Sequence, residues 1–383
     1  MRRLVQNLLL LLASSSLLII VFEVVLRTTH LFDARLAYSK PDSVLAYRFI
    51  PGAEYYHHKE NPKAITGTFN NFGWRDRNWN IEKPRGVTRI AVLGDSFVEA
   101  FQVELESTFI RLTEQTLRTE YKLSVELMNF GRSGFTQTDQ LLLLQSDVDR
   151  FSPDIVIISF LPFNDIEDVR RETAPDSERP FFLVSGKEEL HLDTSFNRTS
   201  AFSVKSRIDG FKRRSALLSL LAERYSMYKL QRDIARQKSA VESRAVELGG
   251  YMSLCTSHPD SEYSRSYRLN KLLIAKMAEY CNARGASMVL MCLNTDAYEP
   301  SREQHFKSID PTFDPNFFED DLKELSSTLQ IHYLGLQRRF REAYDQRQTP
   351  LHWGHWNYSG HRIVAALLSR ELAVIIQGKV TDH

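Results

Sequence analysis

A serine hydroxyl directly follows an apolar run in residues 89–103, which read RIAVLGDSFVEAFQV. The run 90–93 predicts a buried strand, Gly94 predicts a tight turn, and a helix-compatible segment follows Ser96. In open α/β sheets, ligands and chemistry collect at the carboxyl ends of the strands. Ser96 is therefore a candidate nucleophile, provided that the chain also supplies a base and donors for a developing negative charge.

Two other loops end strands in the same manner. A strand over 124–128 runs into a loop that ends at Gly134, and a strand over 154–160 is followed by Asn164 and Asp165. If the sheet has the order 2-1-3-4-5, the first three strands are neighbours. Their loops would then bring Ser96, Gly134 and Asn164 together at one edge of the sheet.

The elements that position these loops alternate between strand and helix. Strands are predicted over 89–93, 124–128, 154–160, 287–293 and 331–336. Helices are predicted over 106–121, 138–151, 263–284, 319–328 and 359–376. This alternation predicts an α/β protein with a flavodoxin-like three-layer α/β/α sandwich and a five-stranded parallel sheet of order 2-1-3-4-5.

The chain divides into three parts by composition. We expect a transmembrane signal anchor over 1–27, a lead-in segment over 28–85, and the main domain over 86–383. The lead-in carries too many aromatic residues to stay solvated, so we expect it to pack on the main domain. A polar, helical insertion over about 166–260 interrupts the alternation, with a hairpin near 181–192 and helices over 214–225 and 227–247. It would cover one end of the sheet as a substrate lid.

The amino terminus suggests a membrane segment. Arg2 and Arg3 precede the apolar run 8–26, which is long enough to cross a bilayer as a helix. We expect a single-pass signal anchor with an extracytoplasmic main domain, in the periplasm or outside the cell. A cleaved signal peptide is the alternative, and a buried core helix fits least because the run has no polar face.

Composition excludes some classes of function. The 383 residues are 43% hydrophobic and 25% charged with a net charge of +1, which does not suggest a nucleic-acid binder. The three cysteines are too few for a disulfide framework. Cys292 lies in a predicted strand, while Cys255 and Cys281 would be free to pair in an oxidising compartment. We expect no cofactor.

The residues Gly94-Asp95-Ser96, Gly134, Asn164-Asp165 and a late His355 together resemble the SGNH (GDSL-type) hydrolase family. The resemblance runs from about residue 89 to the carboxyl terminus, interrupted by the insertion. The leader and residues 72–76 are also similar to the membrane-anchored bacterial members.

The resemblance implies a role for each residue. Ser96 would be the nucleophile and His355 its general base. The backbone N–H groups of Ser96 and Gly134 and the side-chain amide of Asn164 would form an oxyanion hole, each donor worth about 3 kcal/mol. The alternatives are structural, with Ser96 or Asn164 as a cap, Gly134 as a turn glycine, and His355 as a structural histidine.

One member of the family pattern is missing. The family places a catalytic Asp three residues before the His, and here that position is His352. A backbone carbonyl could hold His355, or a carboxylate such as Asp345 or one in the insertion could reach it. His352 itself could accept a hydrogen bond from His355, or the enzyme could have lost most of its activity. We expect a dyad or a relocated acid.

A metal site is a weaker interpretation of the histidines. His352, His355 and His361 lie close in sequence, but no second cluster of ligands completes a zinc site. We therefore expect no metal.

The sequence predicts a serine esterase or deacylase that cleaves an acyl ester, carried by a glycan or a lipid. One alternative is an O-acyltransferase that modifies a cell-envelope glycan. The other is a non-catalytic binding protein that keeps the fold. Beyond the substrate, the expected partner is the membrane, through the N-terminal helix.

Overall fold

The fold is that of a computed structural model of the whole chain. The structure describes every residue except 30, 34–35, 175, 187, 226–227, 229–231, 233–249 and 382–383. The expected helix over 227–247 therefore lies almost entirely outside the described residues.

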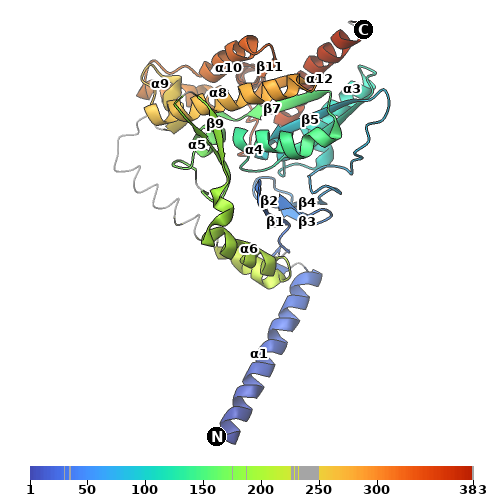
Figure 1. Cartoon of the computed structure of the whole chain (residues 1–383), viewed down its shortest axis with the longest axis vertical. Helices are drawn as coiled ribbons and strands as arrows, with labels where there is room; N and C mark the ends of the chain where they lie inside the picture. The colour runs from blue at the N-terminus through green and yellow to red at the C-terminus, as the bar shows by residue number, and fades with distance from the viewer. Residues whose placement is uncertain are drawn as a thin grey trace.

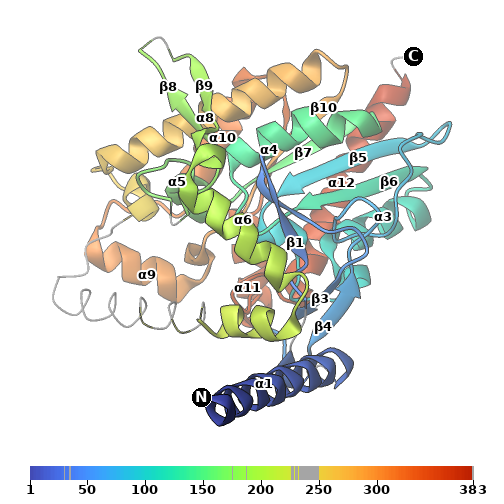
Figure 2. The ribbon, with the colours of Figure 1, turned by 60° about the horizontal axis from the view of Figure 1, so that its bottom comes forward.

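A five-stranded parallel sheet forms the centre of the main domain (Figure 2). The spatial order is β11-β10-β7-β5-β6, which is 2-1-3-4-5 in sequence order read from the other edge. The predicted fold class and strand order are thus confirmed. The strands are β5 (Thr88–Gly94), β6 (Val125–Gly131), β7 (Ile155–Phe160), β10 (Ser287–Cys292) and β11 (His332–Gly335).

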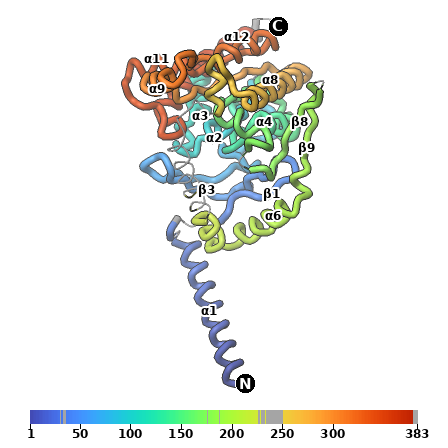
Figure 3. The backbone as a smooth tube through the Cα atoms, turned by 90° about the vertical axis from the view of Figure 1, so that its left-hand side faces the viewer, coloured from blue at the N-terminus to red at the C-terminus, as the bar shows by residue number. Residues whose placement is uncertain are grey.

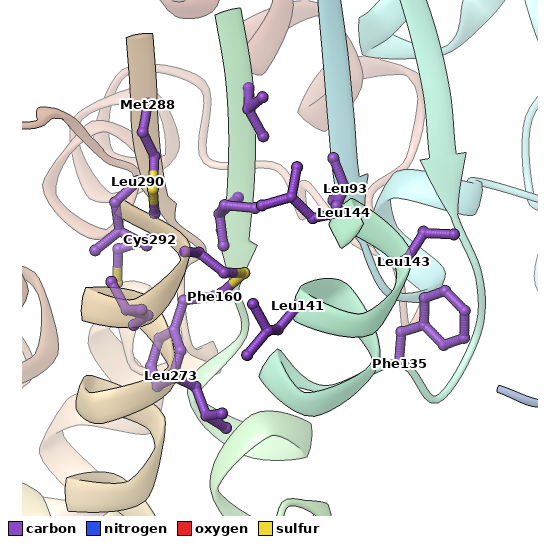
Figure 4. Close-up of a cluster of buried hydrophobic side chains, with 14 of the residues drawn as sticks. Leu93, Phe135, Leu141, Leu143, Leu144, Phe160, Leu273, Met288, Leu290 and Cys292 are labelled. Atoms are coloured by element: carbon purple, nitrogen blue, oxygen red, sulfur yellow. The ribbon is translucent and has the colours of Figure 1, made fainter. Parts of the chain in front are cut away.

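Helices cover both faces because successive strand residues point to opposite sides of the sheet. Ala91 and Leu93 of β5 join one buried cluster, and Ile90 and Val92 join the other. The first cluster receives α4 (Gln137–Leu143), α8 (Ser261–Asn282) and α10 (Phe317–Thr328), and Figure 4 shows its centre. The second receives α3 (Phe109–Thr119), α11 (Gln337–Arg347) and α12 (Tyr358–Thr381).

The cysteines lie within this core. Cys292 is a buried residue of β10, as its sequence context predicts. Cys255 and Cys281 are free thiols, also buried, so the disulfide left open by the sequence does not form.

The lead-in folds into two small antiparallel hairpins. The first pairs β1 (Ser39–Asp42) with β2 (Ala46–Phe49), and the second pairs β3 (Glu54–His57) with β4 (Ile65–Thr68). Their shared hydrophobic cluster contains Phe49, Tyr55, Ile65 and Phe69. Figure 3 shows β1 and β3 between α1 (Arg2–Thr29) and helix α4 of the main domain.

Helix α1 projects away from the rest of the molecule (Figure 1). It has 28 residues, a mean hydropathy of 2.6 over its most apolar window, and none of that window is buried. By length and composition it can cross a membrane.

The described part of the insertion forms a hairpin and helices. β8 (Phe181–Val184) and β9 (Leu190–Asp193) occupy the predicted hairpin. They are followed by α6 (Ser200–Lys212) and a helix over 216–225. Helix α6 packs against β1, so this part of the insertion lies on the lead-in. Two short helices, α2 (Ser96–Glu99) and α5 (Pro162–Asp168), follow β5 and β7, and α9 (Pro300–Ile309) lies between β10 and α10.

Candidate active site

Ser96 begins α2 immediately after β5. The carboxylate of Asp95 caps this helix, accepting a hydrogen bond of 3.0 Å from the N–H of Phe97. At Gly94 a Cβ atom would lie only 2.0 Å from Oγ of Ser159 on β7, so only glycine allows the two strands to approach here. The turn places Oγ of Ser96 2.7 Å from Nε2 of His355.

His355 lies in the turn that precedes α12. His352 and Trp356 pair as an isolated β-bridge across this turn, and the N–H of Trp353 donates to the carbonyl of His355 over 2.7 Å. The ring of His355 lies against Phe97, with centroids 4.8 Å apart. The imidazole is thus held beside the start of α2.

The other nitrogen of His355 contacts Glu60 of the lead-in. Nδ1 lies 2.7 Å from Oε1 of Glu60, and the backbone N–H of His355 donates to Oε2 over 3.0 Å. The next residue, Asn61, is buried and donates to the hydroxyl of Tyr358 and to the carbonyl of Gln102, each over 3.0 Å. The loop between β3 and β4 is therefore fixed at Glu60 and at the residue that follows it.

The carboxylate beside His355 belongs to Glu60, and not to Asp345 or to the insertion, the two sources suggested from the sequence. Asp345 is paired instead with Arg341 over 3.2 Å on the exposed side of α11. No residue of the insertion, within the described ranges, takes the place beside Nδ1. Glu60 is the residue that sequence reasoning missed, and its only local signal is a carboxylate among aromatic residues.

Glu60 and His355 shift each other's pKa. Burial favours neutral His355, but the hydrogen bond and charge of Glu60 outweigh it and raise the pKa of His355. Burial also opposes ionisation of Glu60, and the hydrogen bonds and charge of His355 outweigh that effect and lower the pKa of Glu60. A carboxylate beside Nδ1 favours the tautomer whose free Nε2 faces Ser96.

His352 does not take the position of the acid. Its Nε2 lies 2.9 Å from Nδ2 of Asn294, and its ring stacks on Tyr298 at 5.2 Å. Burial lowers the pKa of His352 to about 4, so the ring is neutral at pH 7. The third histidine, His361, is buried beside Gln102 and serves the packing of α12.

The expected oxyanion donors lie on separate loops. Gly134 has φ of +78°, and a Cβ atom there would meet nothing within 4 Å. Nδ2 of Asn164 lies 3.4 Å from Oδ2 of Asp95. Within the described residues, the N–H groups of Ser96 and Gly134 donate to no protein acceptor. Asn164 lines the same cavity as Ser96, whereas Gly134 does not.

Three buried carboxyl groups accompany these donors. Asp95 precedes Ser96, Glu99 ends α2, and Asp165 follows Asn164. Burial raises the pKa of Asp95 to about 6 and that of Glu99 to about 7. Burial, and then the nearby charge of Asp95, raise the pKa of Asp165 well above its ordinary value. Glu99 accepts hydrogen bonds from the N–H and the hydroxyl of Ser133, so it joins α2 to the loop of Gly134.

The lead-in supports this side of the site as well. Arg132, two residues before Gly134, donates to the carbonyls of Leu45 and Tyr47, and its guanidinium lies 3.6 Å from the centre of the Tyr47 ring. Arg75 is buried and donates to three backbone carbonyls at the end of α2 and just beyond it. Both His355 and the turns around it thus contact the lead-in.

A cavity of about 590 Å³ opens above Ser96 and His355. Of the described part of the insertion, only Tyr251 lines it, so β8, β9 and α6 do not form the expected lid. The lining is Ser96, Phe97, Leu161, Phe163, Asn164, Tyr251, Asn294, Thr295, Asp296, Tyr298, Glu299, His352, Gly354 and His355.

Comparison with known proteins returns only distant similarities. No protein-family profile matches the sequence, and no curated protein does. An alpha/beta hydrolase from the metagenome of Lake Arreo, Spain, is 15% identical with a TM-score of 0.41, covering 74% of this chain and 94% of its own. A catalytic mutant of an acetylxylan esterase from Geobacillus stearothermophilus is 14% identical with a TM-score of 0.38, covering 74% and 93%. An acetyl xylan esterase described without an organism is 14% identical with a TM-score of 0.40, covering 73% and 97%. Similarities this distant carry no argument about activity.

Proposed function

We propose that this protein is a serine esterase or deacylase of the SGNH type that hydrolyses an acyl ester through a Ser96 acyl-enzyme. The observation that carries the proposal is the hydrogen-bonded series from Ser96 through His355 to Glu60, 2.7 Å at each step, at the wall of a cavity. A hydroxyl, an imidazole and a carboxylate in this order form the arrangement that activates a serine nucleophile.

In the first step Oγ of Ser96 attacks the ester carbonyl carbon while Nε2 of His355 takes its proton. The imidazolium that forms is stabilised by Glu60, which also holds Nδ1–H toward itself. The negative charge on the former carbonyl oxygen would be stabilised by the N–H groups of Ser96 and Gly134 and the amide of Asn164.

The tetrahedral intermediate then collapses. The bond to the alcohol oxygen breaks, and His355 gives its proton to the departing alcohol. Water next attacks the acyl-enzyme with His355 again as base, and release of the acid restores the Ser96 hydroxyl. The apolar lining from Phe97, Leu161 and Tyr298 suits the acyl group of a lipid or an acylated glycan.

An O-acyltransferase would use the same acyl-enzyme with a sugar hydroxyl in place of water. The complete Ser96–His355–Glu60 series speaks against a binding protein that has lost its catalytic activity.

We further propose that residues 1–27 anchor the domain in the membrane and place it on the extracytoplasmic side. A reporter fused to the carboxyl terminus that is active only outside the cytoplasm tests this topology.

The activity is tested on the detergent-solubilised full chain with a fluorophosphonate probe. The wild type and the control Ser43→Ala, an exposed serine of the lead-in, should label, and Ser96→Ala should not. Equal labelling of Ser96→Ala would remove the proposed nucleophile. Turnover of para-nitrophenyl acetate with and without an oligosaccharide acceptor then distinguishes hydrolysis from transfer, since only a transferase forms the acylated sugar.

A further inference from the structure

Helix α6 exposes an apolar face at the end of the domain from which α1 leaves (Figure 1). Val204, Ile208 and Phe211 are 53%, 51% and 61% exposed. Spacings of four and three residues put them on one side of the helix. The opposite side, with Phe202 and Ser206, lines a cavity shared with β1 and β2. The apolar side therefore points away from the folded domain.

The segment after α6 is joined directly to α1. The carboxylate of Glu23 accepts hydrogen bonds from the hydroxyl of Ser215 and the N–H groups of Ala216 and Leu217, at 2.9, 2.8 and 3.0 Å. These N–H groups begin the helix over 216–225 and have no acceptor within it. Leu26 is buried against this helix in one small cluster. A carboxylate in an otherwise apolar helix thus caps its neighbour.

This junction fixes the depth of the helices relative to a bilayer. If the apolar run 8–26 fills the hydrocarbon core, Leu26 lies at its boundary. Glu23 is then about 4.5 Å deeper, at a rise of about 1.5 Å per residue. The headgroup region extends about 5–8 Å beyond the core on each side. Residues in contact with Glu23 and Leu26 must therefore lie at the membrane interface.

The charge of this segment suits the same location. Residues 198–225 contain seven Lys or Arg and two Asp or Glu. Arg207 is exposed on α6 beside the apolar face. Basic residues around an apolar face are typical of helices that lie in the interface of a membrane with anionic lipids.

We propose that residues 200–225 form an interfacial collar, which lies in the headgroup layer of the bilayer that α1 crosses and binds anionic phospholipid. The collar inserts Val204, Ile208 and Phe211 toward the acyl chains and holds the domain at a fixed height and tilt. This inference rests on the proposed membrane anchor over residues 1–27 and is independent of the proposed esterase activity.

The test uses the full chain in nanodiscs with a nitroxide attached at Ile208→Cys. The native cysteines are buried, so the label goes to the introduced thiol. Ser327→Cys is the control, because it is an exposed helical position on α10, at the end of the domain far from α1 (Figure 1). We expect the label at 208 to be shielded from a water-soluble paramagnetic nickel reagent and open to oxygen, and the control to show the reverse.

Lipid composition provides the second comparison. Shielding at 208 should increase when phosphatidylglycerol is added to phosphatidylcholine, and Arg207→Gln should reduce that increase. Equal nickel accessibility at 208 and 327 in both lipids would overturn the proposal. Shielding at 208 only in discs that hold two copies would also overturn it, because a second chain would then cover this face.

Discussion

Oε1 of Glu60 lies 2.7 Å from Nδ1 of His355, although the two residues are 295 positions apart in the chain. Oε2 of the same carboxylate accepts the backbone N–H of His355, so one side chain holds both the ring and the loop that carries it. The position where the SGNH pattern places its acid is occupied by His352, which faces Asn294 instead. The lead-in thus supplies the group that the main domain lacks.

Removing the charge of Glu60 should lower the rate and shift its pH dependence. In the wild type, kcat/KM should rise with pH as His355 loses its proton, and Glu60 raises the pKa of that step. In Glu60→Gln the amide cannot stabilise the imidazolium, so the pKa of His355 should fall. The rise of kcat/KM should then occur at lower pH. The plateau should fall by up to about 10⁴-fold, as when a triad loses its carboxylate.

Glu54→Gln is the matched control for this measurement, since Glu54 is an exposed carboxylate of the same lead-in. Its pH profile should superimpose on that of the wild type. If the Glu60→Gln profile also superimposes, Glu60 has no part in positioning the base.

His352 should affect the structure of the site without affecting its titration. His352→Ala removes one of the two acceptors of Nδ2 of Asn294, leaving the carbonyl of Thr295, and also removes the ring that stacks on Tyr298. A buried donor left unsatisfied costs about 1–3 kcal/mol, so the unfolding midpoint should fall. The pH at which kcat/KM is half-maximal should stay within error of the wild type. A shift as large as that of Glu60→Gln would instead place His352 in the proton path.

Gly134 and Gly86 form a matched pair. Both have positive φ, +78° and +73°, and a Cβ atom at either would meet nothing within 4 Å. An alanine at either position should therefore cost a similar amount of stability, about 1–2 kcal/mol for the left-handed conformation. Only Gly134→Ala should also lower kcat, because relief of this strain turns its N–H away from the substrate oxygen. Equal kcat in the two variants would exclude Gly134 from the oxyanion hole.

Glu99 should make the folded protein less stable as the pH rises. Burial raises the pKa of this carboxyl from 4.5 to about 7, so between these values the folded state holds a proton that the unfolded chain has released. The free energy of unfolding should therefore decline across this window, by roughly 3 kcal/mol. Urea unfolding of the solubilised chain at several pH values measures the decline.

The comparison variant is Glu99→Gln, which keeps an acceptor for Ser133 and cannot ionise. Its stability should change less between pH 4.5 and pH 7 than that of the wild type. Parallel curves for the two proteins would show that Glu99 ionises normally.

The sequence by itself determined the sheet and the loops at its edge. Strands such as β7 are buried on both faces, and this leaves an apolar run, broken there only by Ser159, that can be identified without a structure. Because parallel strands present their carboxyl ends at one edge, the strand order predicted that Ser96 and Asn164 would meet, and both line one cavity. Gly134 does not line that cavity, which differs from the prediction that the three loops meet.

Only the tertiary structure decided which carboxylate faces His355. The lead-in is held by contacts that no local pattern encodes, such as the bonds of Asn61 to Tyr358 and of Arg132 to Leu45. Such contacts join segments far apart in the chain, whereas propensity and periodicity report only on neighbours in sequence. For the same reason the sequence did not predict the role of Glu23. This charged residue interrupts an apolar helix, and in the structure it caps the helix over 216–225.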